Sequence, residues 1–179
     1  MTSHNVKYIN RFIAFSIIIL AAFVNSGCFT VKYDFKGGIK IDPRVKTFSV
    51  QYFDNRAPRI EPTLSQRMTD ALKDYIESNT NLRLVTTYGD VDFSGTITNY
   101  NISAAAITAN DVAAQTRFTI AVKVTYSNIY DPDGSYEETF TKSLDFDSST
   151  DISSVEADYS EDMIDEIVEL IFNKAFINW

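Results

Sequence analysis

Residues 118–126 read Phe-Thr-Ile-Ala-Val-Lys-Val-Thr-Tyr and contain the clearest pattern in the chain. Every second residue from Phe118 to Tyr126 is bulky and apolar, and the residues between are polar or small. Successive side chains of a strand point to opposite faces of a sheet, so this alternation predicts a strand with one buried side. The sheet that contains it needs a second layer over its apolar face, while its other face is polar.

The residues that follow predict a hairpin. Asp131-Pro132-Asp133-Gly134 has the composition of a tight turn, in which Pro presets φ and Gly accepts a positive φ. Residues 136–147 then return as a partner strand with Phe140, Leu144 and Phe146 on the apolar side.

Residues 91–102 predict another strand. Val91, Phe93 and Ile97 share one face, and the apolar register then moves by one residue to Tyr100. A shift of this kind indicates a β-bulge.

The first strand is predicted at residues 45–53. Phe48, Val50 and Tyr52 would lie on its buried face, and the turn-forming residues 54–58 would end it.

Two amphipathic helices are predicted at residues 62–78 and 153–176, because apolar residues recur there at intervals of three and four. Thr63-x-x-Gln66 and Ser153-x-x-Glu156 have the form of capping boxes. The element order is therefore β-α-β-β-β-α. We expect an α+β fold, a two-layer α/β sandwich with a four-stranded sheet and two helices on one face, whose Ser/Thr-rich opposite face is open.

The N-terminal segment has the pattern of a lipoprotein signal peptide. Lys7 and Arg11 precede an apolar run at residues 12–24, and small residues lead to Cys28, the only cysteine. Asn25 stands where an aliphatic residue is usual, so an ordinary signal peptide followed by a chance thiol is the alternative. We predict a signal peptide at 1–27, a tether at 28–42 and a single α/β domain at 43–179.

Composition excludes several classes of function for the chain that begins at Cys28. Without Lys7 and Arg11 it has 14 basic against 24 acidic residues, a net charge of −10, which disfavours nucleic acid as a partner. His4, the only histidine, is also lost, so His- or Cys-dependent catalysis and His- or Cys-based zinc sites are excluded. We expect no enzyme activity, no cofactor and no metal.

A carboxylate-dependent hydrolase is the enzyme class that this composition leaves open. Acidic residues cluster at 90–92 and at 145–149. Their spacing fits no calcium-binding loop, so we interpret both clusters as solvated strand ends.

Several segments together resemble one known family. They are Gln-Tyr-Phe-Asp-Asn-Arg-Ala-Pro at 51–58, Pro-Thr-Leu-Ser-Gln at 62–66, Ala-Leu-Lys-Asp at 71–74, Gly-Asp-Val-Asp-Phe-Ser-Gly at 89–95, Asp-Phe-Asp-Ser-Ser at 145–149 and Ile-Phe-Asn-Lys-Ala-Phe-Ile-Asn-Trp at 171–179. This set resembles the lipopolysaccharide-assembly lipoprotein family (LptE), in the form found in the Bacteroidetes.

The resemblance implies a lipid-anchored lipoprotein on the periplasmic side of the outer membrane. Such a protein is a plug and assembly partner of the large β-barrel translocon (LptD) and helps to place lipopolysaccharide in the outer leaflet. No acidic run follows Cys28, which favours the inner leaflet for the anchor. A periplasmic lipoprotein that regulates a cell-wall enzyme or carries a lipid has the same architecture and stays open as the alternative.

Candidate contacts to lipopolysaccharide or to a partner fall into three groups. The first is a basic N-terminal segment, the second is an arginine in the turn at 54–58, and the third is the small-residue segment 103–114, which is long for a hairpin loop. The candidates are Lys32, Lys36, Lys40, Arg44, Lys46, Arg56, Ala104, Ala105, Ala106 and Ile107. For Arg56 the alternative is an ion pair with Asp54, and for segment 103–114 it is a plain flexible loop.

Overall fold

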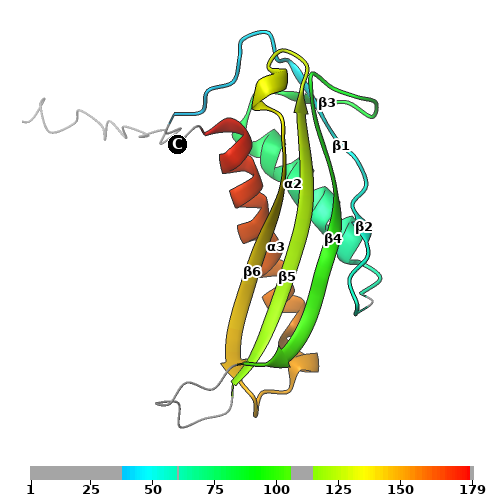
Figure 1. Ribbon diagram of the computed structural model, residues 1–179, viewed down its shortest axis with the longest axis vertical. Coiled ribbons are helices and arrows are strands. Elements are labelled where there is room, and N and C mark those ends of the chain that lie inside the picture. Colours follow the sequence, from blue (N-terminus) through cyan, green and yellow to red (C-terminus); the bar gives the residue numbers. More distant parts are fainter. Residues whose placement is uncertain (1–37, 60, 106–114, 178–179) are drawn as a thin grey trace, which may run out of the picture. The chain divides into compact units, whose positions relative to one another are not determined.

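The computed structural model describes residues 38–59, 61–105 and 115–177 (Figure 1). The predicted signal peptide, Cys28, most of the predicted tether and the candidate contacts Lys32, Lys36, Ala106 and Ile107 lie outside these residues. The elements are β1 (Thr47–Val50), β2 (Asp54–Asn55), α2 (Leu64–Asn79), β3 (Arg83–Leu84), β4 (Val91–Ala104), β5 (Gln115–Asn128), the 3₁₀ turn η1 (Pro132–Gly134), β6 (Tyr136–Asp147) and α3 (Ile152–Phe176).

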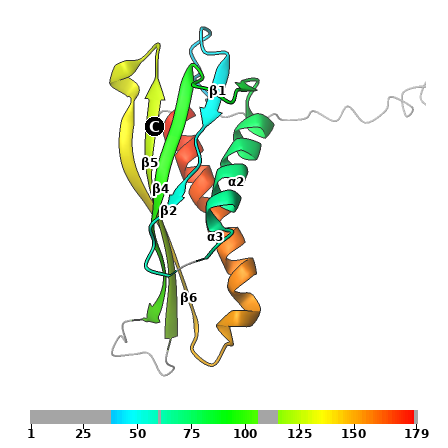
Figure 2. The same ribbon diagram turned by 90° about the vertical axis from the view of Figure 1, so that its right-hand side faces the viewer.

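The sheet has the order β3-β1-β4-β5-β6, with β2 also paired to β4. Strands β4, β5 and β6 form an antiparallel meander, whereas β1 runs parallel to β3 and β4 and β2 runs parallel to β4. Both helices lie on the same face of the sheet (Figure 2). The α+β class with two helices on one face is therefore confirmed. The predicted four-stranded sheet and the predicted element order β-α-β-β-β-α are wrong in detail, because the short strands β2 and β3 bring the sheet to six strands.

The core lies between the sheet and the two helices. The alternation predicted for residues 118–126 is confirmed, because Phe118, Ile120, Val122, Val124 and Tyr126 are all buried. The apolar faces of α2 and α3 complete the core. Their buried residues are Leu64, Met68, Leu72, Ile76, Met163, Ile164, Ile167, Val168, Ile171, Phe172 and Phe176.

The opposite face of the sheet is polar along β5 and β6. Arg117 and Asp145 form an ion pair of 2.6 Å across the two strands, and the hydroxyls of Thr119 and Ser143 are 3.0 Å apart. Arg117, Ser143 and Asp145 are exposed and Thr119 is partly exposed, as expected for a sheet face that no helix of the described chain covers.

The first strand ends earlier than predicted. β1 stops at Val50, and Tyr52, predicted to be buried, is 57% exposed. Phe53 is fully buried instead, and its backbone N–H donates to the hydroxyl of Thr69 at 3.1 Å. Asp54 and Asn55, predicted to break the strand, form β2 and pair with Thr96 and Ile97.

The bulge in β4 is confirmed, because the register of β4 against β5 shifts between Ile97 and Asn99. The strand continues beyond the predicted residue 102, so Ala104 belongs to β4 and pairs with Thr116. The N–H of Ala105 donates to the carbonyl oxygen of Gln115 at 2.9 Å. The remainder of the predicted small-residue loop, residues 106–114, lies outside the described residues.

Both predicted capping boxes are wrong, because a neighbouring carboxylate accepts the hydrogen bond from the Thr63 hydroxyl at one helix start and from the Ser153 N–H at the other. At the start of α2 the Thr63 side chain makes no cap, and its hydroxyl donates to Glu61 at 2.7 Å. At the start of α3 the cap is Asp151, whose carboxylate accepts from the N–H of Ser153 at 3.1 Å.

The turn at 131–134 also differs from the prediction. The described residue with a positive φ is Gly38, not Gly134. Residues 132–134 form η1, and Asp131 accepts a hydrogen bond from the N–H of Gly134. A Cβ at position 134 would meet the Asp131 carboxylate, so a larger residue there would require that side chain to shift.

Candidate functional site

Two of the candidate basic residues lie in one pocket. Lys40 and Arg44 line a polar pocket of about 400 Å³ together with the turn after β5 and the end of α3. The N–H of Lys40 donates to the carbonyl oxygen of Phe176 at 2.9 Å, which fastens the N-terminal segment to α3. The structure therefore brings the beginning of the described chain and the last turn of α3 to the same end of the sheet.

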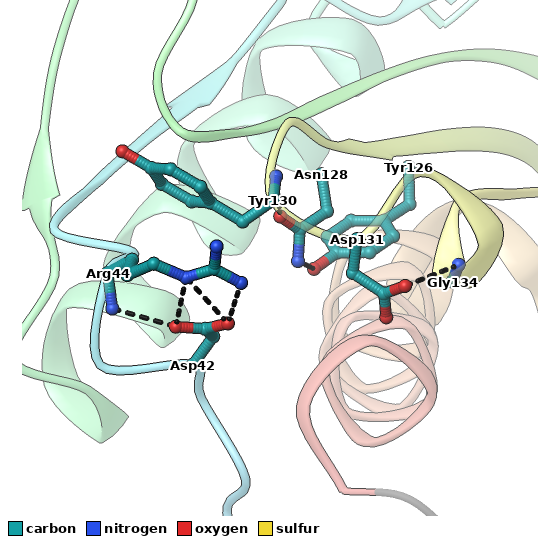
Figure 3. A network of polar contacts seen from close by, with 7 residues as sticks. All are labelled: Asp42, Arg44, Tyr126, Asn128, Tyr130, Asp131 and Gly134. Carbon is teal, nitrogen blue, oxygen red and sulfur yellow. Dashed lines mark hydrogen bonds and ion pairs between the residues drawn. The ribbon is translucent and has the colours of Figure 1, made fainter.

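Arg44 is engaged by its own neighbour (Figure 3). Its Nη2 lies 2.6 Å from Oδ2 of Asp42, and its Nε and backbone N–H also donate to that carboxylate. These bonds lower the pKa of Asp42 to about 2 and raise the pKa of Arg44. The guanidinium also lies 4.9 Å from the centre of the Tyr130 ring. The Arg44 guanidinium is thus already bound by the Asp42 carboxylate through two of its nitrogen atoms.

The other wall of the pocket is a hydrogen-bonded turn, shown in Figure 3. The amide oxygen of Asn128 accepts from the N–H of Tyr130 at 2.9 Å, and its Nδ2 lies 3.4 Å from the hydroxyl of Tyr126. The N–H of Asn128 donates to the Ser135 hydroxyl at 3.1 Å. Burial raises the pKa of Tyr126.

Lys174 is the pocket residue that the sequence analysis missed. Its Nζ lies 3.1 Å from Oε2 of Glu138 and 5.7 Å from the centre of the Tyr136 ring. A lysine in the last turn of a helix is favoured by the helix dipole, and this was the available signal. Periodicity alone does not show which segment meets that helix end.

Lys46 lies outside the pocket, beside the acidic cluster at 90–92. Oδ2 of Asp90 accepts from the N–H of Lys46 at 2.8 Å and from the N–H and hydroxyl of Thr47 at 2.9 Å. The N–H of Lys46 is the largest cause of a lowered pKa at Asp90. Asp92 likewise accepts from Ser49 at 2.5 Å. These carboxylates join β1 to β4, so the predicted solvated strand end is partly exposed and also hydrogen-bonded.

At residues 145–149 the carboxylates also have partners. Asp145 accepts from Arg117, which lowers the pKa of Asp145, and Asp147 accepts from the N–H of Ser149 at 2.8 Å. Both carboxylates remain at an exposed strand end.

The remaining described candidates lie elsewhere. Arg56 follows β2, and its guanidinium is 3.6 Å from the carboxylate of Asp54, so the ion-pair alternative describes its position. Ala104 and Ala105 lie at the far end of β4, which at about 3.3 Å per residue is roughly 40 Å from Val91. The described candidates therefore do not form one site.

A second pocket, an acidic groove of about 700 Å³, lies between α2 and α3. Its charged lining residues are Arg67, Asp70, Asp74, Glu161, Asp165, Glu166 and Glu169. Burial, and then the like charges of Glu161 and Asp162, raise the pKa of Asp165. Within the described parts of the chain, no three His, Cys, Asp or Glu residues are grouped to hold a metal. In those parts no helix has the length and apolarity needed to cross a bilayer.

Solved structures share this fold at low sequence identity. A Xanthomonas campestris protein has a TM-score of 0.53 and 12% identity over 78% of this chain and 90% of that one. A hypothetical protein from Chlamydia trachomatis has a TM-score of 0.51 and 12% identity over 75% and 99%. A minor lipoprotein from Acinetobacter baumannii has a TM-score of 0.49 and 13% identity over 73% and 91%.

The fold is a small α+β sandwich in which two helices cover one face of a mixed sheet, and it is similar to the Xanthomonas and Chlamydia structures. The family model described as Lipopolysaccharide-assembly (LptE) matches residues 45–175, from two residues before β1 into the last turn of α3. The chain belongs to this family. No curated protein sequence matches it significantly.

Proposed function

We propose that the protein is a lipid-anchored outer-membrane lipoprotein and a non-enzymatic subunit of the lipopolysaccharide translocon. In this role it is a plug and assembly partner of the β-barrel (LptD-like) and helps to insert lipopolysaccharide into the outer leaflet. The observation that carries the proposal is the family match at residues 45–175, which includes every strand and nearly all of both helices.

The sequence before the matched region supports the anchor. A basic start, an apolar run of 13 residues at 12–24 and small residues before Cys28 are the parts of a lipoprotein signal. Attachment at Cys28 would leave the chain on the periplasmic side of the outer membrane, because no acidic run follows that residue.

Residue composition supports a binding role over a catalytic one. After residue 28 the sequence has neither histidine nor cysteine, so it lacks the usual nucleophile and base pairs. The contacts we propose are Lys32, Lys36, Lys40, Arg44 and Lys46 near the anchor, Arg56 beside β2, and the segment from Ala104 to Ile107.

The decisive experiment is a pull-down of the tagged full chain from detergent-solubilised outer membrane, followed by mass spectrometry. We expect a large β-barrel at near-equal amounts. A double variant, Ala104→Glu with Ala105→Glu, places charge on the proposed contact segment and should reduce the yield of the barrel. A matched control is Ser143→Glu with Thr141→Glu, which adds the same charge to the polar face of the sheet. Recovery of a cell-wall enzyme in place of a barrel would contradict the proposal and support the alternative lipoprotein role.

A further inference from the structure

The described chain gathers exposed apolar side chains at one end of the sheet. Five large apolar side chains of the described residues are exposed, and three of them lie here: Tyr88 at 81%, Ile129 at 60% and Tyr130 at 37%. The N–H of Ile129 donates to the carbonyl oxygen of Asp90 at 3.0 Å, which joins the loop before β4 to the turn after β5. The two loops that carry the three side chains therefore lie side by side, and we call this part of the surface the aromatic end.

The backbone holds this surface in place. Gly89 is packed so closely on β1 that a Cβ there would lie 2.7 Å from the carbonyl carbon of Phe48. On the other loop, the Asn128 side chain accepts from the N–H of Tyr130, as Figure 3 shows. Burying Ile129 and Tyr130 would require breaking such bonds, so their exposure is a fixed property of the fold.

Two of the cations near the aromatic end already have anionic partners. Arg44 is bidentate to Asp42, and Lys174 is paired with Glu138. Capture of a free phosphate would have to displace these carboxylates. Tyrosine and isoleucine beside neutralised charges are instead suited to the interfacial layer of a bilayer, where amphipathic rings are enriched.

The position of the N-terminal segment favours a bilayer over a protein as the partner of the aromatic end. Lys40 is hydrogen-bonded to Phe176, and Arg44 contacts the Tyr130 ring, so the chain joins the domain at the aromatic end. Ten residues separate Cys28 from Gly38 and span at most about 35 Å when extended. A lipid on Cys28 therefore keeps Gly38, where the described chain begins, within about 35 Å of the membrane surface.

We propose that the aromatic end, formed by Tyr88, Ile129 and Tyr130, docks in the headgroup layer of the phospholipid bilayer that holds the anchor. This inference rests on the lipid anchor of the proposed function and is independent of the barrel. Docking fixes the orientation of the sheet, because β4, β5 and β6 all run from the aromatic end towards the end that carries Ala104 and Ser149.

The test uses the lipidated full chain in vesicles of phosphatidylethanolamine and phosphatidylglycerol. Single cysteines at Tyr88→Cys and Ile129→Cys carry an environment-sensitive fluorophore, and lipid blocks the Cys28 thiol from labelling. Ser149→Cys, exposed at the opposite end of the meander, is the matched control. We expect headgroup-region quencher lipids to quench positions 88 and 129 at least twofold more than position 149. Equal quenching at the three positions would overturn the docking.

Two further measurements distinguish failure of the docking proposal from failure of the proposed lipid anchor. Vesicle flotation reports the anchor, so a protein that floats without quenching at 129 loses the docking proposal and keeps the anchor. A protein that does not float loses both. If positions 88 and 129 become protected only when a β-barrel is reconstituted with the protein, the aromatic end is a protein interface, and the bilayer proposal is overturned.

Discussion

The ring of Phe53 fills the space that Gly95 leaves on the inner face of β4. A Cβ at Gly95 would lie 2.5 Å from Cε1 of Phe53 and 2.5 Å from the carbonyl oxygen of Lys123. The contact explains why the chain leaves its strand register after Val50. The core at this point accepts Phe53 and leaves Tyr52 in solvent.

Gly95→Ala should destabilise the domain by about 2 kcal/mol, because the added methyl group overpacks a site closed by Phe53 and by backbone. Urea denaturation followed by circular dichroism measures the loss. Ser94→Ala, the neighbouring change on the polar face, is the control. In a Phe53→Leu background the cost of Gly95→Ala should fall, and an unchanged cost would contradict the proposed contact.

Asp90→Ala should cost about 2 kcal/mol of unfolding free energy, because the carboxylate accepts three hydrogen bonds from Lys46 and Thr47. Asp133→Ala in η1 removes an exposed carboxylate and should change stability by less than about 0.5 kcal/mol. Equal effects of the two changes in urea denaturation would mean that Asp90 does not fasten β1.

Tyr100→Phe should cost about 1 kcal/mol. The Tyr100 hydroxyl donates to Oε1 of Glu156 at 2.7 Å, and the other oxygen of Glu156 is 2.7 Å from Arg59, so Glu156 joins β4 to the loop before α2. A double-mutant cycle with Glu156→Ala isolates the coupling. The exposed Tyr52→Phe change should have no effect on the denaturation midpoint.

Stability should fall as the pH rises above about 10. Burial is the largest cause of raised pKa values at Tyr100, Tyr126 and Tyr136. A folded-state pKa above the unfolded value gives stability that is complete below the unfolded pKa of about 10 and is lost at higher pH. The effect is measured as the midpoint of urea denaturation at a series of pH values from pH 8 to pH 11, spaced by about one pH unit. Tyr136→Phe should reduce the slope, and an unchanged slope would contradict this assignment.

Cys28→Ala should leave the domain folded and release it into the periplasm, because each buried methylene of an acyl chain contributes about 0.8 kcal/mol to membrane attachment. Cell fractionation measures the release, and circular dichroism checks the fold. Ser26→Ala keeps a small residue before the cysteine and should remain with the membrane. Fractionation of the Cys28→Ala protein with outer membrane that lacks the barrel would refute the tether.

Elements set by local periodicity were predicted well. The meander, its bulge and the two helices follow from alternation of period two or 3.6, which is a property of neighbouring residues. β2 and β3 were missed because two-residue strands have no period, and they exist through pairing with β4 and β1. The sequence pattern placed Tyr52 in the core where the structure has Phe53. The difference was missed because the burial of Phe53 depends on Gly95, which is 42 residues further along the chain.

The candidate site was predictable only in part. A run of basic residues indicated Lys40 and Arg44, but the sequence did not show that Asp42 occupies the guanidinium or that Lys174 joins them. Asp90 was assigned to solvent because its partners are backbone donors of a strand 43 residues earlier. Tertiary pairing of this kind leaves no trace in local spacing.

The parallel placement of β1 has a consequence for the order of folding. Its two neighbours, β3 and β4, both follow it in the chain, and its partners are about 36 and 43 residues away. The meander can assemble through short-range hairpin contacts, whereas β1 must wait for α2 and β4 before it gains a partner. A chain that crosses a membrane N-terminus first would therefore leave Thr47–Val50 unpaired, with Phe48 and Val50 uncovered, for the longest time, and this segment is where a chaperone would be most needed.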